Sequence, residues 1–169
     1  MNIKDAISTE HSKQQRDKIA AYVGTDKKRF ALLMKIFLEA DYRIAQRASW
    51  PVGHIIENHP EMVTPYYGKL LALLKNKEVH PAVLRSITRL FQFTEIPKRY
   101  QGKLMDTCFK FLLSNCIPVA VKAFSITILE QLAIDYPEII PEIKLAIEEN
   151  KDRASPSIRA RAKNILKKA

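Results

Sequence analysis

Apolar and small residues recur at every fourth position in four segments of the chain, as they do along the buried face of a helix. The first residues of these segments lie 39, 38 and 37 positions apart (83 − 44, 121 − 83 and 158 − 121). This spacing is typical of helix-pair repeats, and so short a unit buries its apolar face only by stacking on its neighbours. The pattern therefore predicts a helical-repeat scaffold. The four segments are Ile44/Ala48/Val52, Val83/Ile87/Phe91, Val121/Ser125/Leu129 and Ile158/Ala162/Leu166.

Each repeat is expected to consist of a first helix, a short turn and a second helix. Prolines stand at most of the expected helix starts, where a missing N–H removes no hydrogen bond. No segment alternates with the period of two that indicates a strand. We expect a helical N-terminal cap over 1–25, with a polar helix near 10–22, and a repeat domain over 26–169. The expected first helices are 27–39, 61–76, 97–114 and 137–150, and the expected second helices are 41–58, 81–94, 118–135 and 155–168.

Two stretches of sequence resemble HEAT repeats of the armadillo-like class. They are the segment 62–76 with its continuation at 80–83, and the run 155–162 at the start of the last second helix. This resemblance covers approximately residues 27–169. It implies an all-α fold, a right-handed α-α superhelix of about four helix pairs preceded by an N-terminal helix.

The sequence departs from that family in the charged residues that often link neighbouring repeats. In the family, an Asp in the inter-helix turn and an Arg early in the second helix form a ladder between repeats. Here a basic residue follows the first core position only as Lys122 and Arg159, while Ala45 and Leu84 occupy the earlier copies. We therefore expect stacking to depend mainly on apolar packing.

Positive charge is concentrated at the C-terminal end. The net charge is +10, from 28 Lys and Arg against 18 Asp and Glu, and residues 151–169 contribute 7 − 1 = +6 of it. This end has two interpretations, a surface for an anionic partner such as nucleic acid or a solvated helix that keeps the open end of a repeat stack soluble. We define the basic C-terminal pole as Arg153, Arg159, Arg161, Lys163 and Lys167.

Neither a leader segment nor a membrane span is expected. The N-terminus is polar, and no run of about 20 apolar residues occurs. The two cysteines, Cys108 and Cys116, lie eight residues apart in predicted helix, which favours buried small side chains over a disulfide framework or metal knuckles. The sequence thus predicts a cytoplasmic protein without a membrane partner.

No catalytic residue, metal site or cofactor is predicted. His54 and His59 are five residues apart, whereas a zinc-protease helix needs two His at a spacing of four on one face. The chain is similar in architecture to HEAT-like alkylpurine DNA glycosylases, which depend on a carboxylate one helical turn from a Trp. Four residues after Trp50 this chain has His54, so the resemblance implies no base excision.

A candidate binding site emerges from the helical wheel of the first two repeats. On the helix expected over 41–58, Trp50 projects about 170° and Arg43 about 150° from the centre of the apolar arc. The second helices of HEAT-like stacks line the concave surface, and Trp and Arg are enriched at binding hot spots. The alternative is that the N-terminal helix, or the kink expected at Pro51, buries Trp50 as core. The predicted concave patch is Arg43, Gln46, Trp50, Arg85 and Arg89, and the exposed positions of the third repeat are expected to be Ala123, Thr127 and Glu130.

Three functions are compatible with these patterns. The leading one is a non-enzymatic interaction scaffold that binds a protein partner through its concave face, because a repeat fold by itself provides surface. The second is a nucleic-acid-binding relative of the DNA alkylation repair glycosylases without glycosylase activity, which a pI near 9.6 and the concave arginines favour. An enzyme is the third.

Overall fold

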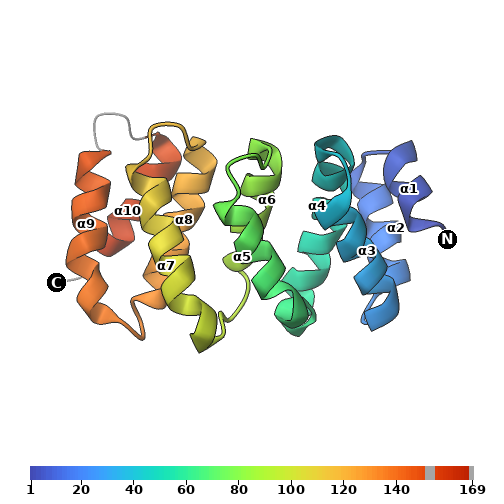
Figure 1. Ribbon diagram of the computed structural model, residues 1–169, viewed down its shortest axis with the longest axis horizontal. Coiled ribbons are helices and arrows are strands. Elements are labelled where there is room, and N and C mark those ends of the chain that lie inside the picture. The colour runs from blue at the N-terminus through green and yellow to red at the C-terminus, as the bar shows by residue number, and fades with distance from the viewer. Residues whose placement is uncertain (151–154, 168–169) are drawn as a thin grey trace. The chain divides into compact units, whose positions relative to one another are not determined.

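The computed structural model describes residues 1–150 and 155–167, and the regular structure of these residues is entirely helical (Figure 1). The chain divides into two compact units, Met1–Glu95 and Ile96–Ala169. The first unit contains α1 (Ile3–Thr9), α2 (Lys13–Val23), α3 (Lys27–Glu39), α4 (Tyr42–Asn58), the 3-10 helix η1 (Pro60–Tyr66), α5 (Tyr67–Lys75) and α6 (Pro81–Phe91). The second contains α7 (Lys98–Leu113), α8 (Val119–Leu132), the 3-10 helix η2 (Pro137–Ile139), α9 (Ile140–Glu149) and α10 (Pro156–Leu166).

In the first unit, α4 is the central element. It packs against its own first helix α3, against α6 of the next repeat, and against α1 and α2 from the N-terminus. Apolar residues on these contacting faces form one core, and burial of each large side chain contributes roughly 1.5–3 kcal/mol before the cost of ordering the chain. The fully buried side chains include Leu33, Phe37, Ala48, Val52, Ile56, Leu70, Ile87 and Phe91.

The second unit repeats this arrangement with two helix pairs. α8 packs against α7 and α10, so second helix stacks on second helix, and α7 packs against α9 as first helix on first helix. The predicted core positions of this unit are buried, including Val121, Ser125, Ile158 and Ala162. The hydroxyl of Ser125 donates to the Val121 carbonyl at 2.8 Å, which satisfies a polar group in the core.

The repeat pattern predicted the buried positions well, with one difference at its start. Ile44, the first core position of the first copy, is only half-buried, because it lies in the first turn of α4. The side chain of Leu166, the last core position of the fourth copy, lies outside the part of the chain that the structure describes.

Side-chain caps explain where several helices begin. Asn2, Ser12, Asp26, Asp41 and Ser155 each accept a backbone N–H from the first turn that follows. At Asp26 the N–H groups of Arg29 and Lys28 stabilise the ionised carboxylate, so its pKa lies below the usual value. His80 caps the N-terminus of α6, where its Nδ1 accepts a hydrogen bond from the Ala82 N–H at 3.1 Å.

Some predicted helices are divided in the structure. The polar helix expected near 10–22 corresponds to α2, which Ser12 caps, and the structure adds α1 before it, a helix that was not predicted. The first helices expected at 61 and 137 begin as the 3-10 segments η1 and η2, each with a Pro at its start. Pro65 inside η1 lacks the N–H that an α-helical ladder would need there. α4, in contrast, runs unbroken past Pro51.

A polar link joins the third and fourth repeats, where the sequence predicted mainly apolar packing. Lys122, on α8, is 7% exposed, and its ammonium donates to the Leu112 carbonyl at 3.0 Å and to Asn150 Oδ1 at 2.8 Å. The Asn150 amide donates to the same Leu112 carbonyl at 2.8 Å. Lys122 and Asn150 thus tie α8 to the ends of α7 and α9, which stand in two neighbouring repeats.

The two cysteines differ in environment. Cys108 is fully buried in α7, and burial raises the pKa of its thiol to about 12, so it stays protonated at neutral pH. Cys116 is exposed in the turn after α7, so the expectation that both are buried is wrong for Cys116. In the structure α7 ends at Leu113, so Cys116 lies in the loop that follows and not on a packed helix face.

Two glycines should respond to alanine in opposite directions. Gly102 lies on the exposed side of α7 with nothing near an added Cβ, so Gly102→Ala should stabilise the protein by about 0.5–1 kcal/mol. Gly24 has φ +49°, which L residues rarely adopt, so Gly24→Ala should destabilise it by about 1 kcal/mol or more. Urea unfolding of both variants measures the difference, and shifts of the same sign would contradict these helix assignments.

Candidate functional site

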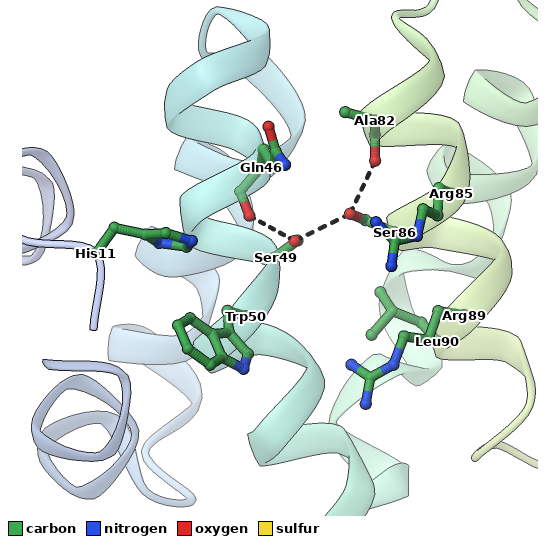
Figure 2. A pocket seen from close by; sticks show the side chains of 9 residues that line it. All are labelled: His11, Gln46, Ser49, Trp50, Ala82, Arg85, Ser86, Arg89 and Leu90. Carbon is green, nitrogen blue, oxygen red and sulfur yellow. Dashed lines mark hydrogen bonds between the residues drawn. The ribbon is translucent and has the colours of Figure 1, made fainter. Parts of the chain in front are cut away.

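A groove lies between α4 and α6, the second helices of the first two repeats, with a volume of about 350 Å³ (Figure 2). The N-terminal segment between α1 and α2 completes one side of it through His11. The residues that line the groove are His11, Gln46, Ser49, Trp50, Ala82, Arg85, Ser86, Arg89 and Leu90. The groove belongs wholly to the first unit.

Two serines join the helices across the groove. Ser86 Oγ lies 3.0 Å from Ser49 Oγ and 2.9 Å from the Ala82 carbonyl, and Ser49 Oγ donates to the Gln46 carbonyl at 2.6 Å. Figure 2 shows this chain of hydrogen bonds running from α4 to α6. Each hydroxyl has a single proton, and each of these protons is already donated to an oxygen of the neighbouring groove residues. What the serines offer a ligand is therefore acceptor capacity.

The helices approach closely at Gly53. A Cβ built there would lie 3.3 Å from Arg89 Nη1 and 3.6 Å from Leu90 Cδ2. The absence of a side chain at this position lets the Arg89 side chain lie along α4. There its Nη2 donates to Glu57 Oε1 at 2.7 Å, and its guanidinium lies 5.5 Å from the centre of the Phe93 ring.

The Arg85 side chain, unlike that of Arg89, is not paired with a carboxylate of the described residues. Arg85 is exposed one turn earlier on α6, and its side chain forms no hydrogen bond or ion pair with any residue that the structure describes. Figure 2 shows both guanidinium groups on the α6 side of the groove, with Trp50 and His11 on the other side. With respect to the described residues, the Arg85 guanidinium is thus free to bind an anion.

Trp50 is half-buried, between the exposed position that the helical wheel predicts and the core position of the alternative interpretation. Its ring lies 5.0 Å from the His11 ring at an interplanar angle of 55°, and the Arg16 guanidinium is 5.2 Å from its centre. Arg47 Nη1 donates to the Ser8 carbonyl at 2.8 Å, which fastens the end of α1 to α4. The N-terminal helices thus cover one part of the indole and leave another part lining the groove.

Arg43 does not join the other members of the predicted patch. It is exposed near the start of α4, where its Nε donates to the Tyr42 hydroxyl at 3.2 Å, and it does not line the groove. The Tyr42 ring stacks on His80, with centroids 3.9 Å apart. The structure therefore brings together Gln46, Trp50, Arg85 and Arg89.

Comparison with protein families agrees with this arrangement of stacked helix pairs. A family described as the HEAT repeat domain matches residues 3–169. The chain belongs to the HEAT-repeat family. Comparisons with curated proteins and with solved structures find no match. HEAT repeats generally mediate protein interactions, and the chain is accordingly a helical-repeat scaffold.

The basic C-terminal pole of this HEAT-repeat protein is less uniform than its sequence. Arg159, Lys163 and Lys167 are exposed. Arg161 instead packs on α8, where its Nε donates to Thr127 Oγ1 at 3.0 Å and its guanidinium lies 5.3 Å from the centre of the Phe124 ring. Arg153 lies outside the described residues.

Sequence reasoning missed His11, Ser49 and Ser86 as groove residues. A signal existed for the position of the groove, because Gln46 and Arg85, and likewise Trp50 and Arg89, are 39 residues apart (85 − 46 and 89 − 50), the spacing of the first two repeats. Equivalent positions on adjacent second helices face a common groove. His11 carries no such signal, since it lies before the repeats.

Two further observations bear on the chemistry of the described residues. Among residues 1–150 and 155–167, no group of three or more His, Cys, Asp or Glu side chains is arranged to hold a metal ion. Within the same ranges, no helix combines the length and the apolar character that a membrane crossing requires.

Proposed function

We propose that this HEAT-repeat protein is a non-enzymatic scaffold that binds a protein partner in the groove between α4 and α6. The observation that carries the proposal is an exposed Arg85 without a partner among the described residues, facing a half-buried Trp50 across a groove of about 350 Å³. Trp and Arg are the side chains most enriched at the energetic centres of interfaces. A groove of this volume is at the small end of the range for ligand sites.

Pre-organisation of the groove supports the same proposal. His11 and Arg16 hold the Trp50 ring from the N-terminal side, and Ser49 and Ser86 connect the two helices. Side chains that are already ordered lose little conformational entropy when a partner binds. The groove is thus suited to accept a partner without rearranging its walls.

Site-specific photo-crosslinking in cells tests this function. A photoreactive amino acid at Gln46, which lines the groove, should yield one or a few discrete crosslinked proteins. The same group at Lys69, exposed on α5 and outside the groove, provides the matched control. Identical products from both positions, or no product from Gln46, would count against the groove as the binding site.

Charge reversal tests whether the arginines are required. Arg85→Glu combined with Arg89→Gln should abolish the Gln46 crosslink without unfolding the protein, as checked by circular dichroism. Gln is preferred at Arg89 because Arg89→Glu would place a second carboxylate beside Glu57, which now accepts from Arg89 at 2.7 Å. An unchanged crosslink in the folded double variant would contradict the proposal.

Nucleic-acid binding is the second candidate, favoured by the exposed Arg159 and Lys163 on α10 and by the exposed Lys167 that follows this helix. Titration of duplex and single-stranded DNA at about 50 and 200 mM salt tests it, because each phosphate contact adds to the salt dependence. No binding at the lower salt would remove this candidate. Release of methylated bases should be undetectable, since no carboxylate lines the groove and His54 follows Trp50 by one turn.

The cytoplasmic location also remains a proposal. Fractionation of cells that express a tagged chain tests it, and recovery of the chain outside the cytoplasm would overturn it.

A further inference from the structure

The groove holds one cation that no described residue compensates. The Glu57 carboxylate pairs with Arg89 at 2.7 Å, and on the far side of Trp50 the Asp17 carboxylate pairs with Arg16 at 2.6 Å. The Arg85 guanidinium has neither an ion pair nor a hydrogen bond with the described residues. The arginine charge left for a ligand is therefore close to one unit, located on α6.

A single positive charge favours a carboxylate over a phosphate. A phosphate monoester carries about −1.5 to −2 charges at neutral pH, so binding one here would leave excess negative charge near Glu57. A carboxylate carries one negative charge and matches the planar donor fork of a guanidinium. The charge balance of the groove thus fits the side chain of Asp or Glu.

The serines distinguish a peptide from a nucleic-acid backbone. The Ser49 and Ser86 protons are already donated to oxygens of the protein. To donate to a ligand, either hydroxyl would have to give up its present hydrogen bond, whereas it can accept a hydrogen bond at no such cost. A peptide backbone supplies N–H donors, whereas the sugar-phosphate backbone of DNA supplies only acceptors. The serines therefore complement an extended peptide segment.

Trp50 adds an apolar surface next to the cation. The indole is held between His11 and Arg16, and Leu90 and Ala82 also line the groove. An aromatic or aliphatic side chain that packs on an ordered indole buries apolar area at a low entropic cost. The groove thus presents an anion-binding group and an apolar wall side by side.

We infer that the groove binds an acidic segment of a partner protein, with one carboxylate on Arg85 and a neighbouring aromatic or aliphatic side chain against Trp50. This inference rests on the proposed function, and it specifies the chemistry of the partner at the same site. The segment lies along α4 and α6, with its backbone N–H groups directed at Ser49 and Ser86.

Selection from a random peptide display library on the full chain tests the inference. Selected peptides should share an Asp or Glu within about three residues of an aromatic or aliphatic side chain, close enough in an extended strand to span the groove. Synthetic copies of the best peptides should change the fluorescence of Trp50, which is the chain's single Trp and so reports on the groove directly.

Charge-neutral variants provide the decisive comparison. Arg85→Gln should weaken binding of the selected peptides about tenfold to a hundredfold, the usual effect of losing a charge-assisted hydrogen bond. Lys69→Gln, which removes an exposed charge of the same unit away from the groove, should leave the affinity unchanged. Thermal unfolding of each variant verifies that the fold is intact.

The outcomes separate this inference from the proposed function. Peptides that bind at Trp50 without an acidic residue, or equally well to Arg85→Gln, would overturn the inference and leave the groove as a protein-binding site. Failure to select any peptide would overturn both. Both would also be overturned if an oligonucleotide, but no peptide, changed the fluorescence of Trp50. That result would favour the nucleic-acid candidate.

Discussion

Phe91→Ala is expected to destabilise the first unit by about 3–5 kcal/mol, the usual cost of replacing a buried Phe by Ala. Phe91 ends α6 with no exposed area, and its ring is nearly parallel to the Tyr67 ring, at 9°, with centroids 5.8 Å apart. Tyr67 is itself buried, and its hydroxyl donates to the Glu95 carbonyl at 2.9 Å. The substitution therefore removes a ring contact and leaves a cavity beside a residue whose hydrogen bond fixes its position.

Phe93→Ala is the matched control, because the same chemical change is made two residues later in the chain. Phe93 is 43% exposed and contacts the Arg89 guanidinium, so its loss should cost about 0.5 kcal/mol or less. Trp50 fluorescence during urea unfolding follows the first unit, and circular dichroism follows all helices. Equal destabilisation by the two substitutions would contradict the core described for this unit.

The repeat was predictable from the sequence because its signal is redundant. The same periodicity recurs at four places, and residues such as Val52, Ile87 and Leu129 are buried as the pattern requires. Local signals that occur once were less informative. The start of α2 depends on one Ser12 hydroxyl, and the 3-10 turns at η1 and η2 depend on how individual prolines interrupt a ladder.

Exposure on the second helices was harder to predict than burial. The helical wheel placed Ala123 and Thr127 on an exposed face of the third repeat, yet Ala123 is 1% exposed and Thr127 accepts from Arg161. The reason is that α10 packs against α8 and covers part of that face. A wheel describes one helix at a time, whereas exposure depends on which neighbour lies over it.

The contacts within the groove were likewise only partly predictable from single helices. The positions of Trp50, Arg85 and Arg89 followed from helical geometry, since each lies opposite the apolar arc of its own helix. The Arg89–Glu57 ion pair and the contact of His11 with Trp50 did not follow, because each joins elements whose relative placement no periodicity encodes. The ion pair occupies Arg89 and leaves Arg85 as the groove arginine without an ion pair to any described residue, and the His11 contact holds Trp50 in place. Together they define the chemistry of the site.

Asn150→Ala is expected to destabilise the second unit by about 1.5–3 kcal/mol, in the range for hydrogen bonds that involve a charged group. The substitution removes the Asn150 oxygen that lies 2.8 Å from the buried Lys122 ammonium, and one of the two donors to the Leu112 carbonyl. Loss of an acceptor costs more at a buried cation than at an exposed one, because water replaces it poorly. Urea unfolding followed by circular dichroism measures the effect.

A double-mutant cycle separates the Lys122–Asn150 hydrogen bond from the packing around it. Lys122→Met keeps the aliphatic stem against α7 and removes the ammonium, so the desolvation cost of the charge disappears together with its hydrogen bonds. Asn150→Ala should therefore cost less in the Lys122→Met background than in the natural chain, with a coupling of about 1 kcal/mol or more. Additive effects would mean that the two side chains act independently, and that mainly apolar packing holds the third and fourth repeats together, as the sequence had suggested.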